Sequence, residues 1–303
     1  MVKKGMNSVN GSNIWLQFTN LTNTQIDENL ALVGVRNYRN DGIVSSRRRK
    51  NINNAFPINA ISLEKKSITR LFPVTAINLQ DTSRYLTSDI IDAHMLLLEK
   101  REHHKLNIQS TYSITGFLNT TQTAHLLRTY IDLTNHNFDD IDLSFESMVN
   151  EINNKFNIME LQYLCLPINI GNIHWHLFVV DIRMREIYLI DSSRGIDANK
   201  YIQTFECIAS LLAAIYQIRM ATNNDEGWTF KILRSPQQQN GVDCGVYVCL
   251  SMSLLADNVE INSALRPREI AIYRNFMIKS FIDNQISRYW LDEHKDIVVK
   301  FNK

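Results

Sequence analysis

One segment constrains the fold of this chain more than any other. A helix is expected to begin near Asp243, and apolar residues surround it on nearly every side: Val246, Val248, Leu250, Met252, Leu254 and Leu255. A helix of this kind is stable only when it is buried. The 303-residue chain must therefore pack other elements around this helix.

Strand-like runs and amphipathic helices supply those elements. The strand-like runs cover residues 161–167, 176–182, 186–191 and about 228–233. Helices are expected at 88–104, after Asp197 and from Pro267, with shorter ones near 122–133 and 144–155. The helix after Asp197 has an apolar stripe that steps by four and three: Tyr201, Phe205, Ile208, Leu212 and Ile215. This order predicts an α+β fold, with a central mixed sheet and helices around it.

Composition and charge exclude several classes of protein. The net charge is +1, but residues 1–60 hold eight basic and three acidic residues, so the remainder is slightly acidic. An acidic body argues against dedicated nucleic-acid binding. Four cysteines with no C-x-x-C pair exclude a disulfide scaffold and the common zinc fingers. No run approaches the ~18 apolar residues of a transmembrane segment, and no secretory signal is evident. We expect a cytoplasmic, monomeric protein.

The chain divides into two unequal parts. Residues 1–60 are interpreted as a basic N-terminal extension of unknown role, and residues 61–303 as the main domain. The run Arg47–Lys50 is interpreted as a solvated loop, with a nuclear-localisation signal or an anion-binding patch as the alternatives. Residues 105–160 have a weaker pattern and are treated as a variable insert.

Cys244 is the candidate nucleophile. It follows a polar, glycine-containing loop and lies at the start of the expected buried helix. The N–H groups and the positive dipole at a helix N-terminus favour a thiolate. Gly245 is expected to let a substrate backbone approach closely. The other cysteines lie in apolar patterns and are interpreted as structural: Cys165, Cys207 and Cys249.

A thiolate nucleophile needs a base, and the base needs a group that orients it. A hairpin centred on Met184 would place Asp191 opposite residue 177, at the same end as His174. The pair His174 and His176 could instead hold a metal, but no third ligand has suitable spacing, so no metal site is expected.

A glutamine in the polar loop is the candidate oxyanion donor. Gln238, six residues before Cys244, could donate its amide to an oxyanion together with the backbone N–H of Cys244. The residues alone do not distinguish among Gln237, Gln238 and Gln239, and an exposed polar loop is the alternative.

Three local motifs carry a resemblance to a known family. Residues 166–175, 188–192 and 237–247 resemble the ubiquitin-like-protein-specific cysteine proteases, the sentrin/SUMO proteases of the adenain-like CE clan. The resemblance covers roughly residues 70–290. It implies an adenain-like fold and a protease without a cofactor. The implied roles are nucleophile, general base and acid, orienting carboxylate and oxyanion donor, for Cys244, His174, Asp191 and Gln238 respectively.

The resemblance also implies where a substrate binds. Trp175 and Tyr85 would wall a narrow tunnel for a Gly-Gly tail, with Gly241 and Gly245 beside it. The family's Asn-Asp after the tunnel aromatic is Thr87-Ser88 here, which removes an acidic contact used with SUMO. Ubiquitin is therefore the first expected modifier, and SUMO or NEDD8 the alternative. An acetyltransferase or a catalytically silent binding module ranks third. A pathogen effector, delivered to the host cytosol or nucleus, is one expected setting.

Overall fold

The computed structural model describes residues 82–108, 114–135, 141–193, 195–220, 227–259 and 267–286. It also describes residues 63, 67, 70, 71 and 261. The expected extension over residues 1–60, including the run Arg47–Lys50, lies outside the described residues.

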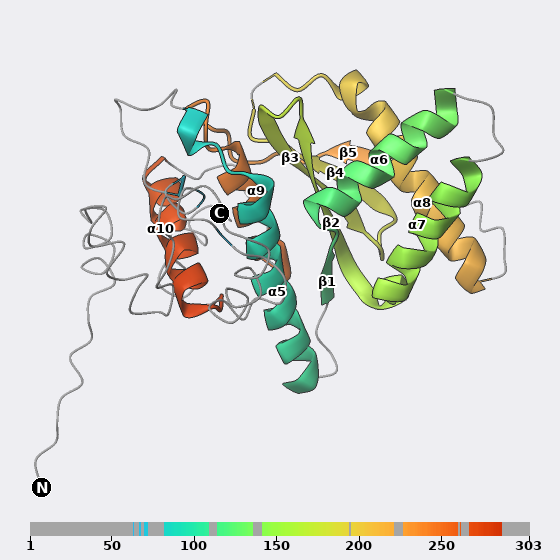
Figure 1. Ribbon diagram of the computed structural model, residues 1–303, viewed down its shortest axis with the longest axis horizontal. Coiled ribbons are helices and arrows are strands. Elements are labelled where there is room, and N and C mark those ends of the chain that lie inside the picture. Colours follow the sequence, from blue (N-terminus) through green and yellow to red (C-terminus); the bar gives the residue numbers. More distant parts are fainter. Residues whose placement is uncertain are drawn as a thin grey trace, which may run out of the picture.

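A five-stranded mixed sheet forms the middle of the fold (Figure 1). Its strands lie in sequence order: β1 (Ile114–Phe117), β2 (Leu161–Ile170), β3 (His174–Asp181), β4 (Glu186–Ile190) and β5 (Thr229–Ile232). The central pairs β2–β3 and β3–β4 are antiparallel, whereas β1 and β5 run parallel to their neighbours. Strand β1 falls inside the range treated as a variable insert and was not anticipated from its four residues.

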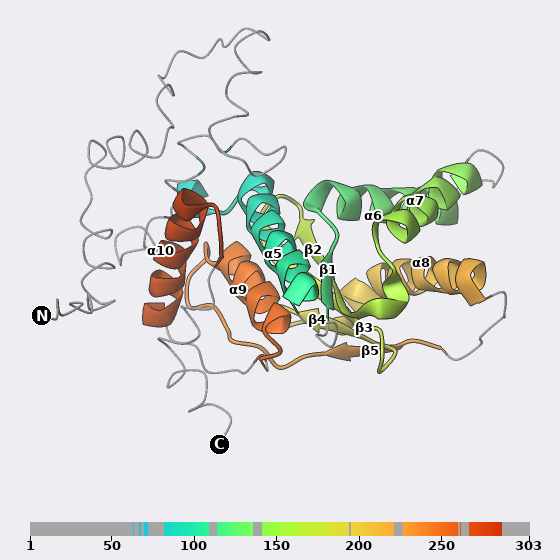
Figure 2. The ribbon, with the colours of Figure 1, turned by 90° about the horizontal axis from the view of Figure 1, so that it is seen from below.

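Helices cover both faces of this sheet (Figures 1 and 2). One face carries α5 (Ser88–Ile108), α9 (Cys244–Ala256) and α10 (Pro267–Asp283). The other carries α6 (Thr120–Asn135), α7 (Ile141–Lys155) and α8 (Ile202–Met220). Short 3-10 turns lie at η1 (Thr82–Arg84), η2 (Ile158–Glu160) and η3 (Ala198–Tyr201). We call the two sides the α9 face and the α8 face.

The alternation of side chains along β3 divides the core into these two faces. Trp175, Leu177 and Val179 point into the core of the α9 face, whereas Phe178 and Val180 point into that of the α8 face. Every residue of α9 is buried, as its apolar sequence predicts.

The segment Ala198–Ile218 is long and apolar enough to cross a membrane by length and composition. In this fold its buried residues pack against the sheet: Cys207, Ile208, Leu211, Leu212 and Ile215. The segment is therefore a core helix here, and Asp197 caps its first turn by accepting a hydrogen bond from Asn199 N–H, as expected.

The register of the β3–β4 hairpin differs by one residue from the sequence-based prediction. Leu177 pairs with Ile190, not with Asp191. The four residues 182–185 form the turn, and its centre lies between Arg183 and Met184 because Arg185 adopts a left-handed conformation with φ 53°. Asp191 is thus brought one position closer to the end of β3 that carries His174.

Candidate active site

Cys244 is the first residue of α9, so its side chain lies where the helix has unpaired N–H groups. It is 1% exposed. Asn240 shapes the preceding loop, because its side-chain oxygen accepts hydrogen bonds from the backbone N–H groups of Val242 and Asp243. The loop therefore delivers Cys244 to the helix N-terminus in a fixed conformation.

A buried arginine holds this loop from α10. Arg274 Nε donates to Asp243 Oδ1 over 2.8 Å, and its Nη2 donates to Val242 O. Its Nη1 reaches the carbonyl of Arg70 over 2.6 Å. Arg274 was not anticipated from the sequence, although a signal was present: it is a charged residue on a helix face whose other members are apolar.

His174 and Asp191 meet at the end of the sheet. His174 Nε2 lies 2.7 Å from Asp191 Oδ1. With Nε2 engaged by the carboxylate, Nδ1 is the nitrogen left to face Cys244. Hydrogen bonds to Asp191 and then to Cys244 raise the pKa of His174 to about 10. The site therefore favours an imidazolium beside the thiol, the charge state that a thiolate nucleophile needs.

The Asp191 carboxylate is held as an anion although it is only 1% exposed. Burial acts to raise its pKa, but hydrogen bonds from His174 and from the Ser193 backbone N–H outweigh burial and lower it. A further hydrogen bond comes from Tyr201, whose hydroxyl lies 2.9 Å from Oδ2. Tyr201 was expected only as part of an apolar stripe, and this contact was not anticipated.

The three consecutive glutamines differ in what their amides bind. Both N–H groups of the Gln237 amide are used, because its Nε2 donates to Asp191 O and Ser235 O. Gln239 is exposed. Gln238 receives a hydrogen bond from Ser192 Oγ and donates one N–H to Asn240 O over 2.8 Å. Among the described residues, none is seen to accept from its second N–H, which leaves that group to donate to a substrate oxygen and favours Gln238 over its neighbours.

Gly245 has a packing role beside the substrate approach expected of it. A Cβ atom there would lie 2.8 Å from Leu86 Cβ and 3.3 Å from Trp175 Cδ1. Trp175 is 3% exposed, and its indole N–H donates to Leu86 O over 2.8 Å. Glycine is thus needed at this position so that α9 can approach Leu86 and the indole.

The other expected substrate contacts lie around this cluster. Tyr85 and Thr87 are half-buried on either side of Leu86, and Ser88 is exposed as the first residue of α5. Gly241 is half-buried in the loop before Cys244. These positions border the candidate site, and the Tyr85 carbonyl accepts a hydrogen bond from Arg70 over 3.0 Å.

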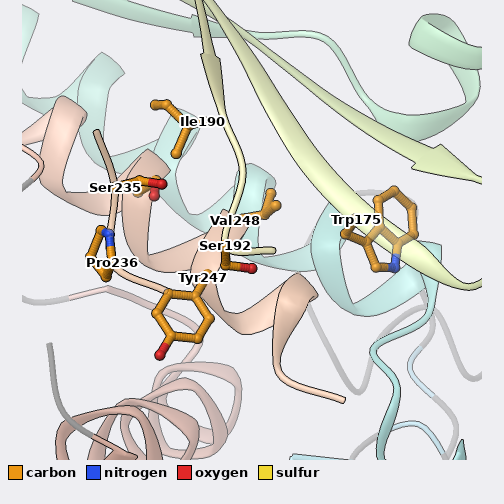
Figure 3. Close-up of a pocket in the computed structure, with 8 residues that line it drawn as sticks. Trp175, Ile190, Ser192, Ser235, Pro236, Tyr247 and Val248 are labelled. Atoms are coloured by element: carbon orange, nitrogen blue, oxygen red, sulfur yellow. The ribbon is translucent and has the colours of Figure 1, made fainter. Parts of the chain in front are cut away.

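A small pocket adjoins the site (Figure 3). It lies between the start of α9 and the ends of β3 and β4, and its lining is mainly apolar. The lining residues are Trp175, Ile190, Ser192, Ser235, Pro236, Tyr247, Val248 and Ser251. Ser192 thus lines the pocket and also holds Gln238, which links this cavity to the loop before Cys244.

The other cysteines and His176 are not placed to act as nucleophiles or metal ligands. Burial raises the pKa of Cys207 to about 12 and raises those of Cys165 and Cys249 further, so these thiols stay protonated. Burial lowers the pKa of His176 to about 4. Within the part of the chain that the structure describes, no group of three or more His, Cys, Asp or Glu side chains could hold a metal ion.

Comparisons with known proteins point to one protease family. The family model described as "Ulp1 protease family, C-terminal catalytic domain" matches residues 84–286, which include every candidate site residue discussed above. Ubiquitin-like-specific protease 1 of Saccharomyces cerevisiae is 32% identical over 98 residues. That match spans 32% of this chain and 15% of the yeast protein.

Solved structures show the same fold. The structure of SUMO protease Ulp1 with its catalytic cysteine oxidised to a sulfenic acid has a TM-score of 0.52 at 19% identity, over 81% of this chain and 98% of that one. The Ulp1-like SUMO protease catalytic domain of Chaetomium thermophilum has a TM-score of 0.51 at 15% identity, over 80% and 91%. The predicted α+β fold is confirmed.

Proposed function

Because this chain belongs to the Ulp1 protease family and is a cysteine protease, we propose that it cleaves after the C-terminal glycine of a SUMO-type ubiquitin-like modifier. The observation that carries the proposal is the line of side chains at one end of the sheet. Asp191 binds His174 over 2.7 Å, and His174 is also hydrogen-bonded to Cys244 at the start of α9.

This arrangement suits acyl transfer through a thioester. The Cys244 thiolate attacks the carbonyl carbon of the modifier's last glycine, and the resulting oxyanion accepts hydrogen bonds from Gln238 and the Cys244 backbone N–H. His174 then gives its proton to the departing amine, and the C–N bond breaks. Water, deprotonated by His174, next attacks the thioester, which releases the modifier's carboxylate and restores the Cys244 thiol.

The choice of modifier rests on two considerations of unequal weight. The names of the related proteins, a ubiquitin-like-specific protease and SUMO proteases, support a SUMO-type modifier. The neutral pair Thr87 and Ser88 argues for ubiquitin, because it lacks the acidic residue that the family uses to contact SUMO. An exposed ion pair contributes at most ~1 kcal/mol, about fivefold in rate, so its loss does not remove SUMO as a substrate. We therefore place SUMO first, and ubiquitin and NEDD8 after it.

Modifier probes that carry an electrophile at the C-terminal glycine test the proposal. SUMO, ubiquitin and NEDD8 probes are added in parallel, and the rate of covalent labelling is measured by gel shift and mass spectrometry. We expect the SUMO probe to label Cys244 fastest. Labelling by ubiquitin more than tenfold faster than by SUMO would overturn the choice of modifier, and absence of labelling by all three would overturn the proposed activity.

The role of Ser88 is tested by charge alone. Ser88→Asp should speed SUMO labelling by up to about fivefold, because it adds an acidic group at an exposed position beside Tyr85 and Thr87. Ser88→Asn is the matched control, since it has nearly the same shape without the charge, and it should label at the wild-type rate. Equal acceleration by both variants would show that the charge at position 88 does not affect binding of the modifier.

A further inference from the structure

We propose that Tyr201 is a positioning residue of the active site, whose phenol O–H holds the second carboxylate oxygen of Asp191 from the α8 face of the sheet. The proposal rests on the proposed thiol chemistry of Cys244, His174 and Asp191. It adds a fourth side chain to that line.

The contacts of Asp191 show what Tyr201 contributes. Oδ1 accepts from His174 Nε2 over 2.7 Å and from the Ser193 backbone N–H over 2.7 Å. The backbone carbonyl of Asp191 accepts from Ser235 Oγ over 2.8 Å. Oδ2 accepts from the Tyr201 hydroxyl over 2.9 Å. The carboxylate is thus held at both oxygens, and Tyr201 fixes its rotation about the bond to Cβ.

The surroundings of Tyr201 fix the phenol in this position. Tyr201 is 7% exposed and ends η3, the turn that Asp197 caps. Its ring packs edge-on against His176, with centroids 5.1 Å apart and planes at 79°, and tilted against Phe178 at 6.3 Å. His176 in turn stacks with His174 at 6.4 Å. The aromatic packing therefore leaves the hydroxyl little freedom to leave Asp191.

The charge states keep the phenol a donor. Burial, then the neighbouring Asp191 carboxylate, raises the pKa of Tyr201, so the hydroxyl remains protonated throughout the working range. The titratable groups that face Asp191 are His174 and His176 from β3 and Tyr201 from η3, with Cys244 of α9 beyond His174. His176 is neutral at these pH values because its pKa is about 4. Tyr201 is therefore an uncharged side-chain donor to the second oxygen of the buried anion.

This arrangement joins the two faces of the sheet through the active site. Cys244 comes from the α9 face, and Tyr201 comes from the α8 face. Without the hydroxyl, Oδ2 would be a buried acceptor with a lost partner, and the carboxylate could turn away from the imidazole. The orientation of His174 toward Cys244 would then be less well fixed, although the ring packing would remain.

Tyr201→Phe tests the hydroxyl alone, since it keeps the ring. We expect kcat for a SUMO-type fluorogenic substrate to fall roughly tenfold with KM nearly unchanged, which is the usual effect of losing one hydrogen bond to a charged group. The acid limb of the pH profile should move to higher pH, because Asp191 loses a donor to its charged form. Tyr216→Phe is the matched control: Tyr216 is similarly buried, packs on Trp228 and should behave as wild type.

A second readout does not depend on the substrate. The rate of Cys244 alkylation by chloroacetamide, followed against pH by mass spectrometry, should show the same shift of the acid limb in Tyr201→Phe. In an Asp191→Ala background the Tyr201→Phe change should have no further effect, because the hydroxyl acts through the carboxylate.

Unchanged kinetics and alkylation in a folded Tyr201→Phe protein would overturn the proposal, as would a loss that persists in the Asp191→Ala background. If the wild type cleaves no modifier but the acid limb of alkylation still shifts in Tyr201→Phe, the proposed function is overturned and the role of Tyr201 stands.

Discussion

The two faces of the sheet are stabilised in different ways. On the α9 face, buried charged and polar groups make directional contacts: Arg274 with Asp243 over 2.6 Å, and Arg101 with Asp257 over 3.2 Å. On the α8 face, aromatic rings and aliphatic side chains predominate, as in the pairing of Phe178 and Phe230 at 6.1 Å. The face that carries Cys244 is thus held by interactions that specify orientation as well as proximity.

The difference has a physical reason. Apolar packing is non-directional, and a core of the right volume tolerates modest rearrangement. Hydrogen-bonded buried charges tolerate much less, because a lost partner leaves an uncompensated charge. A thiol that must meet an imidazole in one geometry therefore benefits from the second kind of support. Five variants, taken from the largest expected effect to the smallest, test this contrast.

Cys244→Ala should abolish turnover and probe labelling, because it removes the nucleophile while deleting little buried volume. Cys249→Ala is the matched control on the same helix and should keep activity, since the Cys249 thiol is buried and protonated. Both are measured with the SUMO probe and by thermal unfolding. If Cys244→Ala retained turnover and a folded Cys249→Ala were inactive, Cys244 would not be the nucleophile.

Asp191→Asn should lower kcat by up to ~10⁴-fold, the loss seen when a triad carboxylate is replaced. Asp191 is the main cause of the raised pKa of His174, so the imidazolium persists to about pH 10 and is lost as the pH rises through that value. In the variant this pKa should fall toward the ordinary 6.5, and the basic limb of the activity profile should move to lower pH with it. A basic limb that does not move would show that Asp191 does not set the pKa of His174.

Arg274→Met should lower the free energy of unfolding by about 3–5 kcal/mol, because it leaves Asp243 buried without its charge partner. Urea denaturation measures the change. The double variant Asp243→Asn with Arg274→Met removes both charges and should recover part of the loss. If the single variant costs no more than ~1 kcal/mol, the directional support inferred for the α9 face is absent.

Gln238→Ala should lower kcat by about 10²–10³ with a small change in KM, as for one oxyanion donor. Gln237→Ala and Gln239→Ala serve as controls in the same steady-state assay, because their amides are respectively fully engaged and exposed. A large fall in kcat in either control, together with an unchanged kcat in Gln238→Ala, would show that the neighbouring glutamine is the oxyanion donor.

Ile208→Val, in the core of the α8 face, should cost only about 0.5–1.5 kcal/mol of stability and leave kcat unchanged. Thermal unfolding and steady-state kinetics measure the two quantities. This variant sharpens the comparison, because Tyr201 is the residue through which we expect the α8 face to affect chemistry. A clear fall in kcat would mean that packing on this face also sets the site.

Elements with a regular pattern of apolar residues could be predicted from the sequence. The buried helix after Asp243 and the two strands of the β3–β4 hairpin follow from apolar patterns. Cys244 could therefore be placed at a helix start, and Asp191 beside His174, in advance. The hairpin register was wrong by one because it depends on the backbone conformation of Arg185. Strand patterns do not specify a turn conformation.

The features that were missed depend on contacts between distant segments. Strand β1 has four residues, and its partner β2 begins more than forty residues later. No local sequence pattern therefore predicts this strand. Tyr201 was assigned to the core correctly, but its hydroxyl contact with Asp191 depends on how η3 meets the sheet. The close approach at Gly245 likewise depends on Leu86, which comes from a segment far earlier in the chain.

The contact between Arg274 and Asp243 also has a consequence for timing during protein synthesis. Arg274 follows Asp243 by 31 residues, and α10 ends at Asp283. A ribosome therefore completes the loop and the thiol of Cys244 before it makes the side chain that locks them. The loop before Cys244 can thus take its held conformation only after Arg274 has joined the chain.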